Sequence, residues 1–294
     1  MSTEQYNGHS MTGDLLRVMV CPPRHSGWES PATAGAWKDL GFLHPPKFEV
    51  AQTQHDVLCR LLKEAGAEVV CLPPRDSLSL DAVYTHDPSL ATDHGLVLMN
   101  PGKKNRVAEA RAHGDFCAQI GIPLAGEISA PGSTEAGDMV WLDSHTLLIG
   151  HAYRTNAAGI GQMRSLLGPK GVEVLSAPLP YGPGPAACLH LMSLMSMLDE
   201  RTILVDLPWI AVETVELLKA RGFRLIEIDY AERDSLACNV LSLGGKRLIA
   251  LEENSRTNQT MREAGFDVRT FPGSELCING SGGPTCLTRP LLRG

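Results

Sequence analysis

The stretch Leu61-Leu62-Lys63-Glu64-Ala65-Gly66 leads directly into the apolar segment from Ala67 to Pro74, and this phrase sets the pattern of the chain. Its first half has the composition of a helix end, and its second half is a β-branched strand that ends in proline. Glycine fits the position after a helix, because a left-handed backbone conformation there ends the helix at little cost. The phrase therefore predicts a helix, a glycine cap and a strand in that order.

The same phrase recurs four more times in the 294 residues. The five glycines are separated by roughly 43 to 55 residues, a spacing within or just beyond the range of radial or stacked repeat architectures. The equivalent glycines are Gly121, Gly171, Gly222 and Gly265, followed by strands at residues 122–128, 172–178, 223–228 and 266–272. We therefore predict an α/β fold built from five repeats.

Further strands follow the earlier copies of the phrase, but none follows the last copy. The clearest are Ser89 to Thr92, Leu96 to Met99, Asp138 to Leu142, Thr146 to Gly150, Cys238 to Leu243 and Arg247 to Leu251. The fifth copy must take its strand from elsewhere, and residues 17–21 and 285–292 are available at the two chain ends. We expect these ends to close a ring around a central cavity. The alternative is an ordinary α/β protein, in which the same element order is common.

No linker, charge block or low-complexity tract interrupts the repeats, so residues 1–294 are expected to form one domain. The polar residues 1–14 are expected to be a flexible tail. Residues 21–47 are rich in Pro, Gly and Trp and predict a long loop, of the kind that often covers a binding site.

The composition is that of a soluble globular protein, with 43% hydrophobic and 20% charged residues. The formal net charge of -7 argues against nucleic acid or an anionic membrane as a partner, because both require a basic face. The sequence shows no signal peptide and no apolar run long enough to span a membrane. We predict a cytoplasmic protein, and the sequence leaves open whether it forms a homodimer.

The eight cysteines are scattered, with no C-x-x-C pair and no spacing of zinc ligands. This pattern is typical of reduced thiols in a cytoplasmic protein. We expect neither a metal nor a cofactor.

One cysteine stands in an unusual setting, Gly280-Ser281-Gly282-Gly283-Pro284-Thr285-Cys286, before an apolar strand. Glycines allow backbone N–H groups to be aimed at a ligand, and a thiolate attacks electrophilic carbon. Cys286 is therefore a candidate nucleophile. The alternative is a small buried cysteine beside a flexible turn.

Three other stretches carry ionisable side chains in apolar surroundings. Asp87 precedes Pro88, Glu135 and Asp138 lead into a strand, and His190 interrupts an apolar run. An Asp-Pro turn, a solvated strand end and a core histidine are the corresponding structural alternatives. Together with a thiol, however, these groups suit chemistry on a guanidinium. Carboxylates hold the cation by paired hydrogen bonds, a thiolate attacks its carbon, and a histidine protonates the departing nitrogen.

At these residues the sequence resembles the guanidino-group-modifying superfamily, and most closely the bacterial dimethylarginine dimethylaminohydrolases. The matching phrases are Asp81-x-Val83-Tyr84-x-x-Asp87-Pro88, Ala130-Pro131-Gly132-x-x-Glu135-Ala136-Gly137-Asp138, Arg154-Thr155-Asn156-x-x-Gly159-x-x-Gln162-Met163, Leu189-His190-Leu191 and Gly282-Gly283-x-x-Cys286. The resemblance implies a five-bladed α/β propeller, the pentein fold, with pseudo-fivefold repeats around the active-site cavity. That fold agrees with the five repeats found in the sequence.

The resemblance also implies roles for individual residues. Cys286 would be the nucleophile that forms a covalent thiouronium, and His190 the general acid and base. Glu135 would orient the histidine and the guanidinium. The substrate-binding residues would be Asp87 for the guanidinium, Arg106 and Arg154 for the α-carboxylate, and Asp81 for the α-amino group.

Two positions bear on the substrate. Arginine deiminases and amidinotransferases typically carry His-x-Asp, but Met192 stands at that aspartate here, which leaves room for N-methyl groups. The family has a glutamate before the guanidinium-binding aspartate, whereas this chain has His86, which we include among the candidate substrate-binding residues.

The expected activity is hydrolysis of an N-ω-methylated arginine to citrulline and an amine, with a small arginine-like molecule as the only partner. Arginine deiminase or dihydrolase activity on free arginine is the first alternative, and amidinotransfer the second. A non-catalytic amino-acid-binding protein is the alternative from another class.

Overall fold

The computed structural model describes residues 6–185, 187 and 189–294, and its strands form five sheets of three strands each. In spatial order the sheets are β15-β1-β2 (Arg289–Arg293, Leu15–Val20, Glu68–Cys71), β3-β4-β5 (Ser89–Thr92, Gly95–Leu98, Leu124–Glu127), β6-β7-β8 (Met139–Asp143, Thr146–His151, Glu173–Pro178), β9-β10-β11 (Met195–Met197, Thr202–Val205, Arg224–Glu227) and β12-β13-β14 (Leu241–Gly244, Arg247–Leu251, Asp267–Phe271).

All five sheets share one topology. The middle strand pairs antiparallel with one neighbour and parallel with the other. A helix lies in each parallel connection, as such a crossover requires. These helices are α2 (Phe48–Glu64), α3 (Val107–Gln119), α4 (Ala157–Leu167), α5 (Val212–Ala220) and α6 (Ser255–Glu263). The repeat unit is therefore strand, strand, helix, strand.

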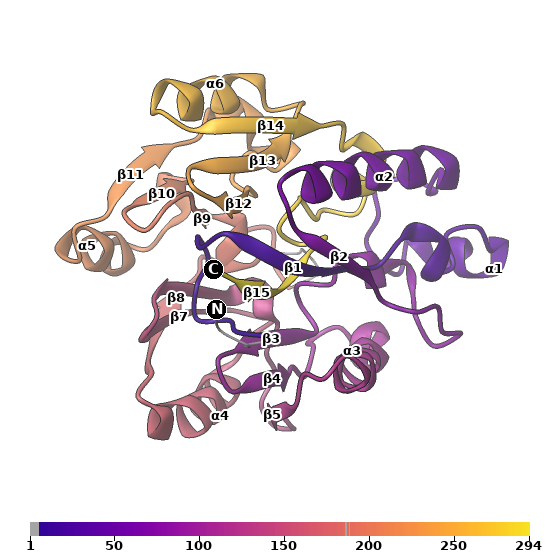
Figure 1. Ribbon diagram of the computed structural model, residues 1–294, viewed down its shortest axis with the longest axis horizontal. Coiled ribbons are helices and arrows are strands. Elements are labelled where there is room, and N and C mark those ends of the chain that lie inside the picture. Colours follow the sequence, from indigo (N-terminus) through magenta and orange to yellow (C-terminus); the bar gives the residue numbers. More distant parts are fainter. Residues whose placement is uncertain (1–5, 186, 188) are drawn as a thin grey trace.

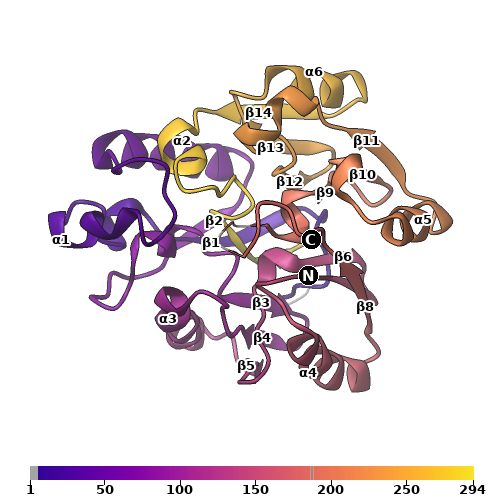
Figure 2. The same ribbon diagram turned by 180° about the vertical axis from the view of Figure 1, so that it is seen from behind.

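The five units are arranged around a centre near which both chain ends lie (Figure 1). Helices α2 to α6 lie on the outside of this arrangement, and the view from behind shows the same order of units (Figure 2). The mixed α/β fold with five repeats that the sequence predicts is confirmed.

The assignment of strands to repeats differs from the prediction. Each sheet contains the strand of one helix-glycine-strand phrase and two further strands. In four of the five sheets these two strands precede the phrase in the chain. A short turn joins the two as an antiparallel pair, and the helix then crosses over to the parallel strand. The fifth phrase is therefore complete. The first phrase, which ends in β2, is the one that lacks a strand, and β15 supplies it by pairing antiparallel with β1. The chain ends meet as expected, but in the first unit.

The glycine that follows each helix has the predicted left-handed conformation. The φ angle is 97° at Gly66, 84° at Gly121 and Gly171, 80° at Gly222 and 96° at Gly265. A methyl group added at Gly66 or Gly265 would meet nothing within 4 Å, so backbone conformation and not space selects glycine there.

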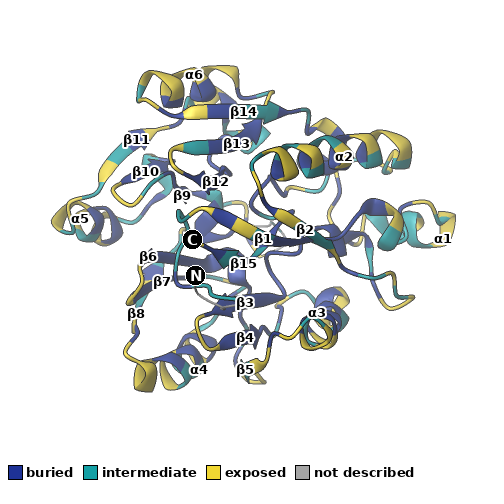
Figure 3. Ribbon diagram, in the orientation of Figure 1, coloured by how far each residue is buried: buried dark blue, intermediate teal, exposed yellow. Residues whose placement is uncertain are grey.

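Apolar side chains pack between the sheets and their helices. Figure 3 shows buried residues along the inner strands and exposed residues on the outer sides of the helices. Trp141 in β6 and Phe271 in β14 are the largest fully buried side chains. Burial of such a side chain stabilises the fold by about 1.5–3 kcal/mol, so the strands hold the loops at their ends in fixed positions.

The N-terminal residues lie against the last strand. Asn7 Nδ2 donates a hydrogen bond to the carbonyl of Arg293, and buried His9 stacks on Trp141 with ring centroids 4.0 Å apart. Of the tail expected at residues 1–14, residues 1–5 lie outside the described part of the chain.

The predicted long loop at residues 21–47 contains the short helix α1 (Pro31–Ala34) and no strand. Its far end is held by a hydrogen bond from the backbone N–H of Leu43 to the carbonyl of Asn279. Among the described residues, no helix is long and apolar enough to cross a membrane.

Candidate active site

A cavity of about 1280 Å³ lies among the loops, and its lining residues come from all five units. Five polar side chains stand at equivalent places, each shortly before the first strand of a unit. They are Asp87 before β3, Glu135 before β6, His190 before β9, Asn239 before β12 and Cys286 before β15. Four of them line the cavity, and Glu135 is fully buried in contact with His190. The repeated fold thus brings together residues that are far apart in the sequence.

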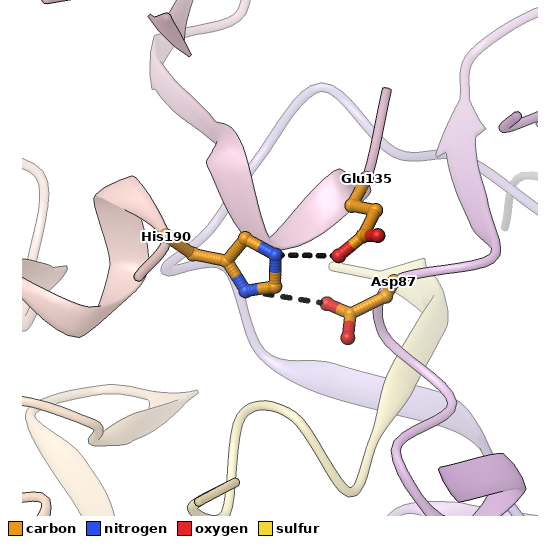
Figure 4. A group of neighbouring side chains, drawn as sticks. All are labelled: Asp87, Glu135 and His190. Atoms are coloured by element: carbon orange, nitrogen blue, oxygen red, sulfur yellow. Dashed lines mark hydrogen bonds and ion pairs between the residues drawn. The ribbon is translucent and has the colours of Figure 1, made fainter. Parts of the chain in front are cut away.

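Glu135, His190 and Asp87 form a buried cluster in which the imidazole lies between two carboxylates (Figure 4). His190 Nε2 donates to Glu135 Oε2 over 2.7 Å, and His190 Nδ1 lies 3.9 Å from Asp87 Oδ1. This arrangement fixes the ring plane and stabilises a protonated imidazole.

The charge state of the two carboxylates follows from their neighbours. Burial would raise the pKa of Glu135, but the hydrogen bond and charge of His190 and the charge of Arg154 lower it far below its usual value. Burial likewise acts against ionisation of Asp87, but the charges of His190 and Arg106 outweigh it and lower its pKa. Both groups are anionic at neutral pH, as binding of a cation requires.

Asp138, the second carboxylate in the stretch that contains Glu135, has a raised pKa instead of a lowered one. Burial raises the pKa of Asp138 to about 6. Its Oδ1 accepts a hydrogen bond from the backbone N–H of Leu191, the residue after His190, over 2.9 Å. Asp138 therefore anchors the histidine-bearing segment and does not line the cavity.

The glycines before Cys286 allow close packing of its loop. A methyl group at Gly282 would lie 2.4 Å from the ring of Tyr84, and one at Gly283 would lie 2.6 Å from Asn239 Oδ1. The thiol is partly exposed and lines the cavity together with His190. Close packing against Tyr84 and Asn239 thus presents the thiol to the cavity.

Asn239 contacts the sulfur directly, with Nδ2 3.1 Å from Cys286 Sγ. Its Oδ1 accepts a hydrogen bond from the backbone N–H of Thr285, which fixes the amide so that the N–H points at the thiol. An N–H donor at this distance stabilises a thiolate. Asn239 is not among the site residues predicted from the sequence, because its stretch carries no charge, although its place before the first strand of a repeat could have revealed it.

The two arginines of the predicted site lie beside the acidic cluster. Arg106, only 4% exposed, forms an ion pair with Asp87 and donates to a second carboxylate, that of Glu109, with Nη2 2.8 Å from Oε2. Arg154 Nη1 lies 3.3 Å from Glu135 Oε1. Both arginines line the cavity, each paired with a carboxylate.

Asp81 lines the cavity as well, with its carboxylate bound by the ammonium of Lys103. The same Lys103 Nζ donates to the carbonyl of Leu40, from the 21–47 segment. The sequence analysis did not single out Lys103, because one lysine in a polar loop carries no pattern.

His86 is not brought to the large cavity. Its Nδ1 donates to the carbonyl of Thr288 over 2.9 Å, and its ring lines a separate small cavity together with Met192. Burial, with the charge of Arg289, lowers the pKa of His86 to about 3, so the side chain is neutral. Met192 is also absent from the residues that line the large cavity, because it packs in the apolar core between units.

Asp87, Glu135 and His190 each offer one ligand atom, and these atoms lie within 4.8 Å of one another, a spacing that a metal ion can occupy. Arg106 and Arg154 already bring positive charge to the two carboxylates, so a divalent cation would be repelled.

Comparison with known proteins gives a consistent family. Residues 46–293 match the family model described as N,N dimethylarginine dimethylhydrolase, eukaryotic. The N(G),N(G)-dimethylarginine dimethylaminohydrolase of Pseudomonas aeruginosa is 28% identical over 84% of this chain and 90% of its own length. The uncharacterized protein YkgA of Bacillus subtilis is 28% identical over 96% of this chain and 93% of its own.

Two solved structures share the fold at low sequence identity. SxtG, an amidinotransferase from Microseira wollei, superposes with a TM-score of 0.80 at 17% identity, covering 98% of this chain and 97% of its own. The N-terminal domain of ArgZ, a cyanobacterial arginine dihydrolase, superposes with a TM-score of 0.79 at 23% identity, covering 95% of this chain and 97% of its own.

Proposed function

Because the chain belongs to the N,N-dimethylarginine dimethylhydrolase family, we propose that it hydrolyses the guanidino group of an N-ω-methylated arginine to citrulline and an amine. The family model and the dimethylarginine dimethylaminohydrolase of Pseudomonas aeruginosa support a hydrolase that acts on C–N bonds. The observation that carries the finer proposal is the convergence of Cys286 and the His190–Glu135 pair on one cavity that also holds Asp87.

The proposed reaction has two steps. The Cys286 thiolate attacks the central guanidinium carbon, the bond to the methylated nitrogen breaks, and the departing amine takes its proton from His190. Water then attacks the covalent thiouronium and His190 takes one proton from that water. The C–S bond breaks to give citrulline and the free thiolate, and the second proton of the water passes through solvent to the released amine, which becomes an ammonium ion. Glu135 holds the imidazole throughout, and Asn239 stabilises the sulfur anion.

Substrate binding is proposed on the anionic side of the cavity. Asp87 would bind the guanidinium, and Asp81 the α-ammonium. Arg106 and Arg154 would bind the α-carboxylate. To do so, Arg106 must exchange Asp87, and Arg154 must exchange Glu135, for the carboxylate of the substrate. We assign no contact with substrate to His86, whose ring lies outside the large cavity.

We also propose that residues 1–294 form one catalytic domain, a five-bladed α/β propeller that works in the cytoplasm. The shared topology of the five sheets and the pairing of the chain ends support the closed propeller. The seven free cysteines of the described residues support a reducing compartment.

The test is a product assay by mass spectrometry. Purified protein is given asymmetric dimethylarginine, monomethylarginine, arginine and canavanine separately, with a Cys286→Ala variant as control. Citrulline and dimethylamine from asymmetric dimethylarginine, absent with the variant, are the expected result. Lack of turnover of either methylated substrate would refute the proposal.

Arginine dihydrolase activity is the second candidate, favoured by the fold shared with ArgZ. Turnover of arginine without turnover of the methylated substrates would identify it. Binding of these compounds with no product would instead indicate an amino-acid-binding protein.

A further inference from the structure

The most informative contact that the proposed reaction does not use is that of Lys103. Its ammonium lies inside the cavity wall and donates to two acceptors, the carboxylate of Asp81 and the carbonyl of Leu40. Asp81 is only 5% exposed at its side chain and Lys103 21%. The carboxylate of Asp81 and the carbonyl of Leu40 thus form a binding site for an ammonium group, and the side chain of Lys103 occupies it.

The site joins three separate segments. Asp81 belongs to the 3-10 turn Leu80–Val83, Lys103 stands in the loop between β4 and α3, and Leu40 lies in the 21–47 segment. All three residues line the large cavity. Lys103 therefore ties the 21–47 segment to the cavity wall at the point where Asp81 lines the cavity.

Lys103 differs from the arginines beside the other carboxylates. Arg106 is held by Asp87, by Glu109 and by the carbonyl of Tyr84, so it stays anchored by the last two contacts even when it exchanges Asp87 for a ligand. Lys103 makes its contacts with Asp81 and Leu40 through a long, flexible and partly exposed side chain. A lysine in this state can be displaced at modest cost.

We propose that Lys103 determines substrate specificity by competing with the α-ammonium of the substrate for Asp81. The inference rests on the proposed function, which places that ammonium at Asp81. Two ammonium groups placed side by side on Asp81 repel each other, and Lys103 already occupies Asp81 Oδ2 and the adjacent carbonyl of Leu40. A substrate with an α-amino group must therefore displace Lys103, whereas a guanidino acid without one binds with Lys103 in place.

The experiment compares the binding of two ligands by calorimetry in a Cys286→Ser background, where no turnover occurs. The ligands are asymmetric dimethyl-L-arginine and its counterpart without the α-amino group, 5-(N′,N′-dimethylguanidino)pentanoic acid. Lys103→Met removes the charge and keeps the side-chain length. Lys104→Met is the matched control, because Lys104 is the adjacent lysine and is exposed.

For each variant we compare the association constant of dimethyl-L-arginine with that of its counterpart without the α-amino group. In Lys103→Met we expect the ratio of the first constant to the second to rise about fivefold, the factor that corresponds to about 1 kcal/mol. The ratio stays at the wild-type value in Lys104→Met, and it does not rise in Lys103→Arg, which keeps the charge beside Asp81. An unchanged or lower ratio in Lys103→Met would overturn the inference, including the case in which Lys103 only tethers the 21–47 segment and both affinities fall together.

The proposed function is tested separately by turnover in the protein with Cys286 intact. If that protein forms no citrulline but the affinity ratio still rises in Lys103→Met, the proposed reaction is refuted and the competition at Asp81 is supported. Turnover with an unchanged ratio retains the reaction and refutes the competition. Failure of both ligands to bind refutes both.

Discussion

At the residue scale, the contact between Asn239 and Cys286 has a direct chemical consequence. The amide N–H at 3.1 Å from the sulfur stabilises the thiolate, which is the reactive form of cysteine. We predict that Asn239→Ala slows alkylation of Cys286 by iodoacetamide at pH 7 about tenfold, since a hydrogen bond to a charged group contributes about 1.5–3 kcal/mol.

The measurement is the rate of modification at Cys286, read by mass spectrometry of the peptide that contains it. A Cys286→Ala protein identifies labelling at other thiols. Asn239→Ala must unfold at the same denaturant concentration as the wild type for the comparison to hold. An unchanged rate would show that the amide does not act on the thiolate.

The residues of the candidate site were predicted from the sequence to very different degrees. Asp87, Glu135, His190 and Cys286 stand in stretches where a charge or a thiol interrupts apolar sequence, and the structure brings all four together. His86 has the same appearance in sequence, but its ring points to the opposite side of the backbone. Adjacent residues near a strand face opposite ways, and the sequence alone could not say which of the two faces the cavity.

At the scale of elements, the helix-glycine-strand phrase predicted the repeat and its caps but not the grouping of its strands. Gly66 and the four equivalent glycines mark helix ends, which local backbone geometry determines. Whether a strand pairs with the one before or after the helix depends on long-range contacts. The pairing of β15 with β1 spans the whole chain, and no local signal encodes it.

The glycines of the Cys286 loop provide the prediction at this scale. A methyl group at Gly282 would lie 2.4 Å from the ring of buried Tyr84, so the loop must shift. We predict that Gly282→Ala lowers kcat at least tenfold and destabilises the fold by about 1–3 kcal/mol, as overpacking of a filled interior does.

The matched control is Gly161→Ala in the interior of α4, where an added methyl group meets nothing within 4 Å. This change should leave activity intact and stabilise the protein by about 0.5–1 kcal/mol, because glycine is a poor helix former. Activity assays and urea unfolding of both variants give the comparison. Equal activity in Gly282→Ala and the wild type would contradict the packing argument.

At the scale of the whole molecule, buried ionisable groups determine how stability depends on pH. Burial lowers the pKa of His55 to about 4 and those of His86 and His113 to about 3. Below pH 6.5 the unfolded chain therefore binds protons that the folded protein does not, and stability falls as the pH falls toward 4.

Two buried acids act in the opposite direction. Burial raises the pKa of Glu109 to about 7 and that of Asp138 to about 6, so the folded protein keeps their protons where the unfolded chain has lost them. These three histidines and two acids leave about one net proton, which corresponds to about 1.4 kcal/mol per pH unit. Burial also lowers the pKa of His9, which adds to the loss in the same direction. We predict that stability falls by at least about that amount between pH 6 and pH 5.

The variant His113→Gln tests this account, because it removes one of the three histidines from the balance. His113 is 1% exposed and its Nδ1 contacts Ser89 Oγ at 2.9 Å, a contact that an amide can also make. The free energy of unfolding in urea is measured at pH 7, 6 and 5 for both proteins. The wild type should lose stability between pH 6 and pH 5, and the variant, with one fewer buried neutral histidine, should lose about 1 kcal/mol less over that interval whatever its absolute stability. Wild-type stability that rises on acidification would mean that the buried acids outweigh the histidines, and identical slopes in the two proteins would mean that His113 takes up a proton in the folded state.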